Sequence, residues 1–336
     1  MWHSSLANKY RPSTFNDVSS QRSVVKVLER QLEVNNFVNS YLFTGPSGCG
    51  KTTLARIFAN KINKGLGEPI EIDAASNNGI DSIRQIIEQA DQRALDAEYK
   101  IYIIDEAHQI TSAGWAALLK LIEEPPKYTI FMFCTTEIQK VPETIQNRCQ
   151  QYRLTRIPNA DILRRLVYIC NKEEYDYTKE ALDQITKMAL GSMRQAIAYL
   201  DKCKDYGDIT LSNVLATLGS FSYDTYFGLV NSIIDKREDS LIDTIEALYN
   251  SGSDLKLFIE LFLDFLLDLT KYTIFRSFDI IKIPESYKKT LEYTINVENA
   301  SKYFNHLIDK VLELKVISKG DSNLKTTIEI FLLTRI

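Results

Sequence analysis

Cysteine and histidine are scarce in this chain, with five cysteines and three histidines among 336 residues. The cysteines are widely spaced, and no two of them form a C-x-x-C pair: Cys49, Cys134, Cys149, Cys170 and Cys203. This spacing excludes a disulfide framework and a cysteine zinc site, and it predicts reduced thiols in a cytosolic protein.

Long uncharged apolar runs are also missing. The most apolar segment is Leu255–Leu269, and charged residues recur through it at every fourth position: Lys256, Glu260, Asp264 and Asp268. This polar stripe predicts a surface-exposed amphipathic helix and excludes a membrane span. The start, Met1-Trp-His-Ser-Ser-Leu6, lacks a basic region followed by an apolar core, so we expect no signal peptide.

No strong charge of either sign is present, because the formal net charge is only −4 at pH 7. That balance excludes a protein that coats nucleic acid through its overall charge, but it is compatible with a local basic patch. The length predicts two or three domains with sizeable cores.

The first part of the chain alternates short apolar runs with helical patterns. The runs are nearly continuous and rich in β-branched or aromatic residues, as in strands covered on both faces: Tyr41–Thr44, Ile70–Ile72, Ile101–Ile104, Thr129–Cys134 and Gln151–Leu154. The helical patterns lie between them: Ser23–Val34, Lys51–Asn63, Gly79–Leu95 and Ala113–Ile122. This alternation predicts a parallel α/β sheet with crossover helices.

Only helical patterns follow Pro158. Four of them precede a break near residue 219: Asn159–Asn171, Thr178–Leu190, Met193–Lys202 and Asp208–Leu218. Further helices are expected from Ser222 onward, with breaks near Ser251-Gly-Ser, Ile283-Pro-Glu and Lys319-Gly-Asp. We therefore predict an α/β core over residues 1–157, a small helical domain over 158–219 and a larger helical domain over 220–336.

One loop carries most of the chemical information. Residues 45–53 have the spacing G-x-x-x-x-G-K-[ST], between an apolar strand and an amphipathic helix. Its glycines let backbone N–H groups face phosphate oxygens, Lys51 can contact the β- and γ-phosphates, and the Thr52 hydroxyl can bind Mg²⁺. An ordinary glycine-rich turn is the alternative, but motif, strand and helix agree. We expect the whole loop to bind a nucleoside triphosphate: Gly45, Pro46, Ser47, Gly48, Cys49, Gly50, Lys51, Thr52 and Thr53.

Two carboxylates follow the strand Ile101–Ile104. Asp105 is placed to coordinate Mg²⁺, and Glu106 is placed to polarise the attacking water. The alternative is a pair that caps the next helix. We expect His108 to pack or hydrogen-bond rather than to bind a metal.

Three further residues are weaker candidates. Thr136 follows the strand Thr129–Cys134, where a hydroxyl could contact the γ-phosphate. Arg148 and Arg194 are suited to stabilise charge on a transferring phosphoryl group. From spacing alone, each arginine is more typical of a surface ion pair.

Further motifs accompany the phosphate-binding loop along the chain: Lys9-Tyr-Arg-Pro12, Phe15-Asn-Asp-Val18, Gln21, Ile70-Glu-Ile-Asp-Ala-Ala-Ser76, Asp105-Glu-Ala-His108, Ala117-Leu-Leu-Lys-Leu-Ile-Glu-Glu-Pro-Pro126, Asn147-Arg-Cys149 and Gly191-Ser-Met-Arg194. Together and in this order, these motifs resemble the gamma/tau ATPase subunits of bacterial DNA polymerase III clamp loaders, which are AAA+ proteins. The resemblance covers essentially the whole chain.

The resemblance implies roles that spacing does not. Arg148 would be an arginine finger that reaches the ATP of a neighbouring subunit. Thr136 would be the first sensor and Arg194 the second, carried by a helical lid. The last domain would be a collar that holds the subunits together. Four residues would line the adenine pocket: Tyr10, Arg11, Pro12 and Val18.

The family also binds DNA, and Arg84 and Lys120 match its DNA-contacting positions. Three features depart from the family pattern. Asn77 and Gly79 stand where basic residues are common, which weakens an argument for DNA binding from charge. Lys64-Gly-Leu-Gly-Glu-Pro69 stands where a four-cysteine module is usual, so we expect no zinc. Asn147 replaces the usual serine before the finger.

The resemblance implies an ATPase that uses ATP and Mg²⁺ to open a sliding clamp and load it onto primer–template DNA. Its expected partners are the other subunits of a five-membered ring, the clamp and the DNA, with no membrane. We expect a cytoplasmic protein without the tail of tau-type subunits, and its Lys/Asn/Ile/Tyr-rich composition fits an AT-rich bacterial or phage source. A branch-migration motor and a non-hydrolysing scaffold subunit are the alternatives. Glu-Glu-Pro-Pro and Asn-Arg-Cys disfavour the first, and the intact loop disfavours the second.

Overall fold

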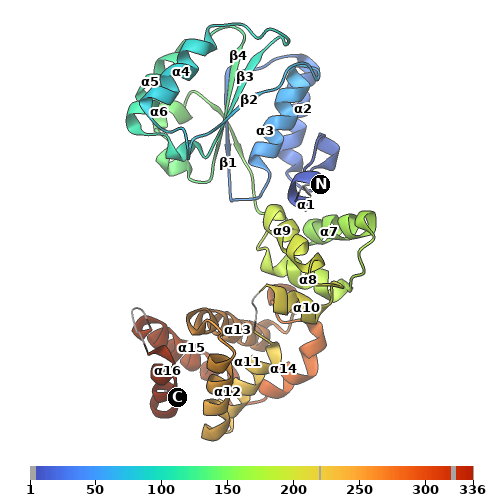
Figure 1. The fold of residues 1–336 in the computed structure, drawn as a ribbon, viewed down its shortest axis with the longest axis vertical. Coiled ribbons are helices and arrows are strands. Elements are labelled where there is room, and N and C mark those ends of the chain that lie inside the picture. Colours follow the sequence, from blue (N-terminus) through green and yellow to red (C-terminus); the bar gives the residue numbers. More distant parts are fainter. Residues whose placement is uncertain (1–4, 219–220, 319–322, 336) are drawn as a thin grey trace. The chain divides into compact units, whose positions relative to one another are not determined.

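The computed structural model describes residues 5–218, 221–318 and 323–335 (Figure 1). The chain forms two compact units. The first contains residues up to 174 together with residues 189–201, and the second contains residues 175–188 and everything from residue 202 onward. The predicted helical domain over residues 158–219 is therefore divided between the two units, and its boundary at residues 219–220 lies outside the described residues.

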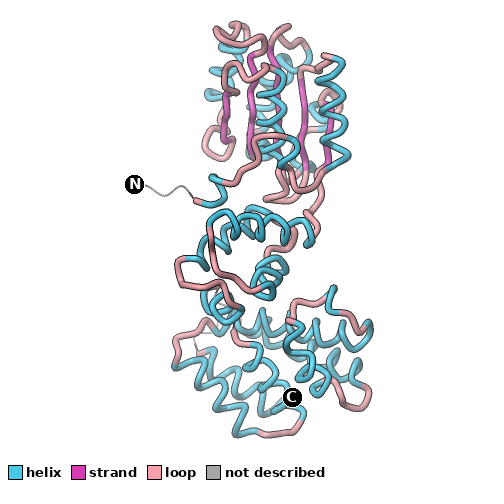
Figure 2. The backbone as a smooth tube through the Cα atoms, turned by 90° about the vertical axis from the view of Figure 1, so that its right-hand side faces the viewer, coloured by secondary structure: helices cyan, strands magenta, loops and turns pink. Residues whose placement is uncertain are grey.

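The first unit is built on a five-stranded parallel sheet in the order β2-β3-β4-β1-β5. Its strands are β1 (Ser40–Thr44), β2 (Ile70–Asp73), β3 (Lys100–Asp105), β4 (Thr129–Thr135) and β5 (Gln150–Arg153). They are the only strands among the described residues, as Figure 2 shows. The sequence therefore predicted all five strands, although β5 lies one residue earlier than expected.

Helices cover both faces of this sheet (Figure 1). Alternate strand residues explain why: Tyr41 and Phe43 pack toward α2 and α3, whereas Leu42 and Phe131 pack toward α4 and α5. The helices of this unit are α1 (Leu6–Lys9), α2 (Arg22–Val34), α3 (Lys51–Ile62), α4 (Ile80–Ala90), α5 (Ser112–Glu123), α6 (Glu143–Gln146), α7 (Asn159–Glu173) and α9 (Met193–Lys204), of which α9 runs past the unit's last residue. Short 3₁₀ turns add Phe15–Asp17, Ala107–Gln109 and Ile138–Lys140.

The predicted helix Gly79–Leu95 was too long, because α4 ends at Ala90. Side chains from other elements bond its last carbonyl oxygens: Thr129 Oγ1 donates to Ala90 O over 2.9 Å, and Lys100 Nζ donates to Gln89 O over 2.7 Å. Leu95, which the pattern placed on the helix, is fully exposed.

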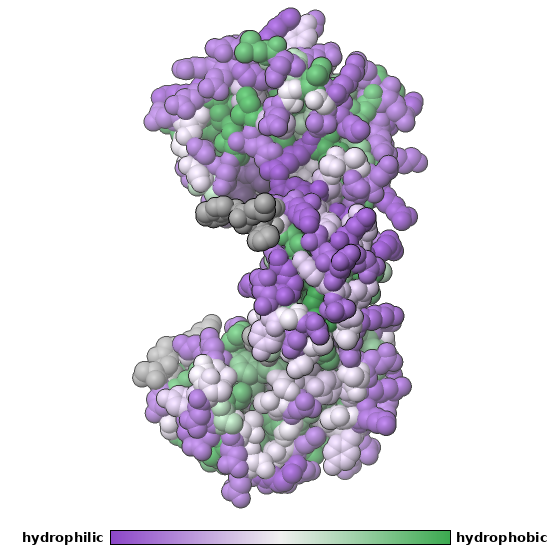
Figure 3. Space-filling model, turned by 45° about the vertical axis from the view of Figure 1, so that its right-hand side comes forward, coloured by the Kyte–Doolittle hydropathy of each residue, from purple (hydrophilic) through white to green (hydrophobic). Residues whose placement is uncertain are grey.

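The second unit is entirely helical in its described part. It contains α8 (Lys179–Met188), α10 (Leu211–Thr217), α11 (Tyr223–Ile234), α12 (Glu238–Asn250), α13 (Leu255–Phe275), α14 (Lys288–Thr294), α15 (Ala300–Ile317) and α16 (Leu324–Arg335), with 3₁₀ turns at Phe278–Ile280 and Glu285–Tyr287. The expected break at Lys319-Gly-Asp lies outside the described residues. In Figure 3, neutral and hydrophobic side chains are interspersed with hydrophilic ones over this unit, whereas hydrophilic side chains dominate the first unit.

Helix α13 corrects one prediction. It contributes many apolar side chains to the core of its unit, and its polar stripe is incomplete because Asp268 is only 3% exposed. Asp268 Oδ2 accepts a hydrogen bond of 2.7 Å from Lys282 N. The other three charged residues of the stripe are exposed, so α13 is the surface-exposed amphipathic helix that was expected, except at Asp268. In the part of the chain that the structure describes, no helix has the length and apolar character needed to cross a membrane.

Candidate functional site

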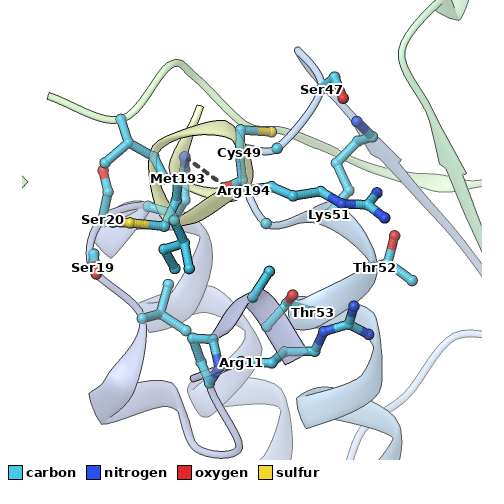
Figure 4. A pocket seen from close by; sticks show the side chains of 18 of the residues that line it. Arg11, Ser19, Ser20, Ser47, Cys49, Lys51, Thr52, Thr53, Met193 and Arg194 are labelled. Atoms are coloured by element: carbon cyan, nitrogen blue, oxygen red, sulfur yellow. Dashed lines mark hydrogen bonds between the residues drawn. The ribbon is translucent and has the colours of Figure 1, made fainter. Parts of the chain in front are cut away.

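A pocket of about 280 Å³ lies beside the loop that joins β1 to α3 (Figure 4). Most of its lining comes from three parts of the first unit: the N-terminal segment, the loop with the start of α3, and the start of α9. It contains most of the predicted nucleotide-binding residues: Tyr10, Arg11, Pro12, Val18, Ser47, Gly48, Cys49, Gly50, Lys51, Thr52, Thr53 and Arg194, with Asp105 and Glu106 from the end of β3.

The loop has the backbone of a phosphate cradle. Gly45, Gly48 and Gly50 all have positive φ, and Gly50 caps the N-terminus of α3 in the left-handed region. A side chain at Gly48 would meet the Ser192 hydroxyl at 2.0 Å, so the close approach of Ser192 requires glycine there. The N-terminus of α3 therefore faces the pocket with unsatisfied N–H groups and its positive dipole end, which suits an anion.

Lys51 is the cation of this cradle and is only 7% exposed. Its Nζ donates hydrogen bonds of 3.0 Å to the carbonyl oxygens of Gly45 and Pro46. These contacts hold the ammonium group over the loop. Gly45 and Pro46 thus act through their backbone and do not line the pocket themselves.

Thr52 and Asp105 meet where β3 ends beside α3. Thr52 Oγ1 donates a 2.7 Å hydrogen bond to Asp105 Oδ2, and Glu106 N donates a 2.9 Å bond to Asp105 Oδ1. A hydroxyl and a carboxylate side by side are oxygen ligands of the kind that Mg²⁺ prefers. Both predicted metal ligands are therefore placed to act together. Among the described residues there is no group of three or more His, Cys, Asp or Glu that could hold a metal.

The start of α9 is joined to the loop. Met193 N donates a 3.1 Å hydrogen bond to Gly48 O, which fixes the first turn of α9 against the loop. Arg194 is the next residue, and Figure 4 shows its side chain extending past the loop on the side of Lys51 and Thr52. This second predicted arginine therefore reaches the pocket.

The N-terminal segment closes the other side of the pocket. Tyr10 is fixed by its hydroxyl, which donates to Glu173, and by its ring, which packs edge-on against Tyr168 at 6.3 Å. Arg165 from α7 donates a 2.8 Å hydrogen bond to Tyr10 O. These contacts connect the predicted adenine-pocket residues to α7.

Several lining residues were not predicted as site residues: Ala7, Ser19, Ser20, Gln21, Arg56, Ile157, Arg165, Met193 and Ile197. Arg56 could have been found, because it is four residues after Thr52 and so lies on the same face of α3. No comparable helical spacing links Gln21 or Arg165 to the loop, although Gln21 is one of the residues that carry the family resemblance. Gln21 Nε2 donates to Thr155 O over 2.7 Å, and Gln21 Oε1 accepts from Thr155 N over 3.2 Å.

Besides Gly45 and Pro46, four more predicted residues do not line the pocket: Thr136, Arg148, Arg84 and Lys120. Thr136 is half-buried directly after β4. Arg148 follows α6, where its Nη2 lies 2.6 Å from Glu123 Oε1 and its Nη1 donates to Thr144 O over 2.7 Å. Arg84 and Lys120 are exposed on α4 and α5. Their predicted roles stay predictions.

The five cysteines are free and buried. Burial raises the pKa of the Cys49 thiol above its ordinary value, although the Lys51 charge works in the opposite direction. Cys49 is therefore a neutral thiol at pH 7 and fills space in the loop.

Comparison with solved structures shows the fold. The RuvB Holliday junction branch migration motor of Thermotoga maritima matches with a TM-score of 0.53 and 19% identity over 73% of this chain and 86% of that chain. The match confirms the predicted fold, an α/β core followed by helices.

Comparison of sequences shows the family. Residues 68–158 match the family described as DNA polymerase III, delta subunit, and residues 209–319 match DNA polymerase III subunits gamma and tau domain III. The Bacillus subtilis DNA polymerase III subunit tau is 35% identical over 87% of this chain and 57% of that protein. The Mycoplasma genitalium subunit gamma/tau is 30% identical over 88% of this chain and 53% of that protein. The chain thus spans little more than half the length of these two relatives.

A shorter relative is covered almost completely. The DNA polymerase III subunit gamma of Buchnera aphidicola is 31% identical over 332 residues, which are 92% of this chain and 86% of that protein. The chain therefore belongs to the family of DNA polymerase III gamma and tau subunits.

Proposed function

We propose that this chain is an ATP-hydrolysing subunit of a DNA polymerase clamp loader. ATP binding and hydrolysis would drive the opening of a sliding clamp and its loading onto primer–template DNA. The observation that carries the proposal is the pairing of Thr52 with Asp105 at 2.7 Å beside the buried Lys51, in a chain of the gamma and tau family. A scaffold subunit that bound no MgATP would have no need for this arrangement, and Glu106 beside it adds the base that hydrolysis requires.

The residues divide the chemistry between them. Lys51 and Arg194 would bind the phosphates, and Thr52 and Asp105 would hold Mg²⁺. The ion, when bound, neutralises charge on the β- and γ-phosphates. Glu106 would accept a proton from the water that attacks the γ-phosphorus, while the bond from that phosphorus to the β–γ bridging oxygen breaks and ADP leaves. Thr136 would sense the γ-phosphate.

Arg148 would complete the site of a neighbouring subunit. Its side chain is 39% exposed and does not line the pocket of its own chain, which suits a finger acting in trans. Its ion pair with Glu123 would have to open for that reach. Hydrolysis would then depend on assembly.

The partners follow from this proposal. We propose a cytoplasmic five-membered ring held by a collar over residues 220–336, with a lid over residues 158–219 and a core over residues 1–157. Exposure of Arg84 and Lys120 on neighbouring helices α4 and α5 supports contact with DNA phosphates. The absence of zinc stays an expectation from the sequence.

Two substitutions test the proposal, and both are measured on the complex assembled with its partner subunits. Lys51→Ala removes the phosphate-binding charge, so ATP affinity should be lost. Arg148→Ala removes a finger whose loss costs roughly 10³–10⁵ in turnover, while ATP binding should stay nearly intact. Equilibrium binding of a fluorescent ATP analogue and steady-state phosphate release separate the two effects. Wild-type turnover in the Arg148→Ala complex would contradict the trans assignment.

A further inference from the structure

His108 lies in the short turn after β3 and is almost completely buried, with a side chain that is 6% exposed. Both of its ring nitrogens lie near a carboxylate. Nδ1 is 3.4 Å from Glu106 Oε2, and Nε2 is 3.3 Å from Glu137 Oε1. Nδ1 is also 3.2 Å from Thr135 Oγ1, and Nε2 is 3.2 Å from Gln109 Nε2. The imidazole thus bridges the turn after β3 and the end of β4.

Glu106 lies at one end of this bridge, 3.4 Å from His108 Nδ1. Its backbone is in the left-handed region with φ of 48°, a conformation that costs free energy for a residue with a side chain. Its Oε2 is buried, and no hydrogen bond reaches it. The ring of His108 is therefore placed to restrain the one carboxylate that the mechanism needs as a base.

The residues that contact the ring from the end of β4 are held by further hydrogen bonds and ion pairs. Thr135 is completely buried at the end of β4, and its Oγ1 accepts a 3.0 Å hydrogen bond from Glu137 N. Lys140 Nζ lies 3.0 Å from Glu137 Oε2. The imidazole is therefore in contact with the end of β4, one residue before Thr136.

We propose that His108 is a positioning residue that orients the Glu106 carboxylate and links its orientation to the end of β4. The inference rests on the proposed function, because it requires Glu106 to act as the base. It also requires Nδ1 to carry a proton, because a lone pair on Nδ1 would face the Glu106 oxygen and repel it.

Three substitutions distinguish the two sides of the ring. In His108→Asn the amide nitrogen takes a place close to Nδ1, and in His108→Gln it takes a place close to Nε2. His108→Ala removes both nitrogens.

If Nδ1 acts on Glu106, His108→Ala should lower kcat for ATP hydrolysis by about 10- to 100-fold with little change in KM, as losing an orienting partner does elsewhere. His108→Asn should recover most of that loss and His108→Gln much less. Gln109→Ala is the matched control, because it removes only the exposed contact between Gln109 Nε2 and His108 Nε2.

A double-mutant cycle with Glu106→Gln separates positioning from support of the fold. Glu106→Gln alone should reduce kcat by about 10²–10⁴-fold. Adding His108→Ala to it should change kcat by less than about twofold, because the residue that His108 positions is already gone. All rates are measured on the assembled complex with MgATP, clamp and primed DNA. Unchanged MgATP affinity shows that each pocket is intact.

Two results would overturn the inference: equal rates for His108→Asn and His108→Gln, or losses that multiply in the double variant. A wild-type complex that hydrolyses no ATP would instead contradict the proposed function, and this inference with it.

Discussion

Gln21 shows how a single side chain can hold the site from outside the loop. Its amide bonds both backbone groups of Thr155, at 2.7 and 3.2 Å, and its Nε2 lies 3.5 Å from Cys49 O. The residue is buried and has φ of 66°, so its own backbone is strained. The phosphate-binding loop and the segment after β5 are thereby fixed to the start of α2.

Replacing Gln21 by glycine should test this role without adding strain, because glycine tolerates a positive φ. Loss of the two amide bonds to Thr155 should destabilise the protein by about 1–2 kcal/mol and weaken ATP binding. Thermal unfolding and titration with an ATP analogue measure the two effects. Asn35→Gly is the matched control, since Asn35 is exposed at the other end of α2 with φ of 48°. Equal effects of the two variants would contradict the role of the amide.

The sequence predicted Lys51, Thr52 and Asp105 because local spacing determines their places. The loop motif fixes the first two, and the end of a buried strand beside the loop fixes the third. Gln21 was not predicted as a site residue, because its partner Thr155 lies 134 residues away and no local pattern links them. The Glu123 partner of Arg148 was missed for the same reason.

Helix periodicity predicted which elements exist better than where they end. Helix α3 begins at Lys51 as expected, because the loop motif marks its start. The end of α4 at Ala90 is set by side chains of Thr129 and Lys100, which come from other elements. Similarly, the four-residue spacing of charges in α13 could not show that Asp268 is buried, because its partner Lys282 lies beyond the helix.

Asp268 gives α13 a pH-dependent stability. Burial raises the pKa of this carboxyl above its ordinary value, although the hydrogen bond from Lys282 N and the charge of Lys271 oppose the shift. A raised pKa means that the folded state binds the proton more tightly than the unfolded state does. The cost of the buried charge is therefore absent below the unfolded pKa and fully present above the folded pKa.

Asp268→Asn should accordingly raise the thermal unfolding midpoint of the second unit at pH 7, because an amide can still accept the bond from Lys282 N without carrying the charge. The gain should shrink as the pH falls through the raised pKa of Asp268, because the wild-type carboxyl then becomes protonated and its charge no longer costs free energy. Calorimetry at several pH values measures this. Asp309→Asn, an exposed change on α15, should stay within about 0.5 kcal/mol of wild type at each pH. A gain for Asp268→Asn that does not depend on pH would contradict the explanation.

At the scale of the whole molecule, the described residues combine a pocket at the G-x-x-x-x-G-K-[ST] loop with an arginine, Arg148, that does not line it. The pocket is assembled within the first unit, whereas Arg148 is paired with Glu123 outside it. The second unit contributes a separate helical core that matches the third domain of the gamma and tau subunits. This division is what a subunit needs if its hydrolysis depends on neighbours.

We propose that partner subunits, the clamp and primed DNA control ATP hydrolysis by this chain. The most direct test is to purify the tagged chain with its partners, to establish the composition by native mass spectrometry and to measure phosphate release with and without clamp and primed DNA. We predict a five-membered assembly whose hydrolysis rises strongly only when clamp and primed DNA are both present. A homohexamer whose hydrolysis is stimulated by branched DNA and indifferent to the clamp would contradict the account and favour a branch-migration motor.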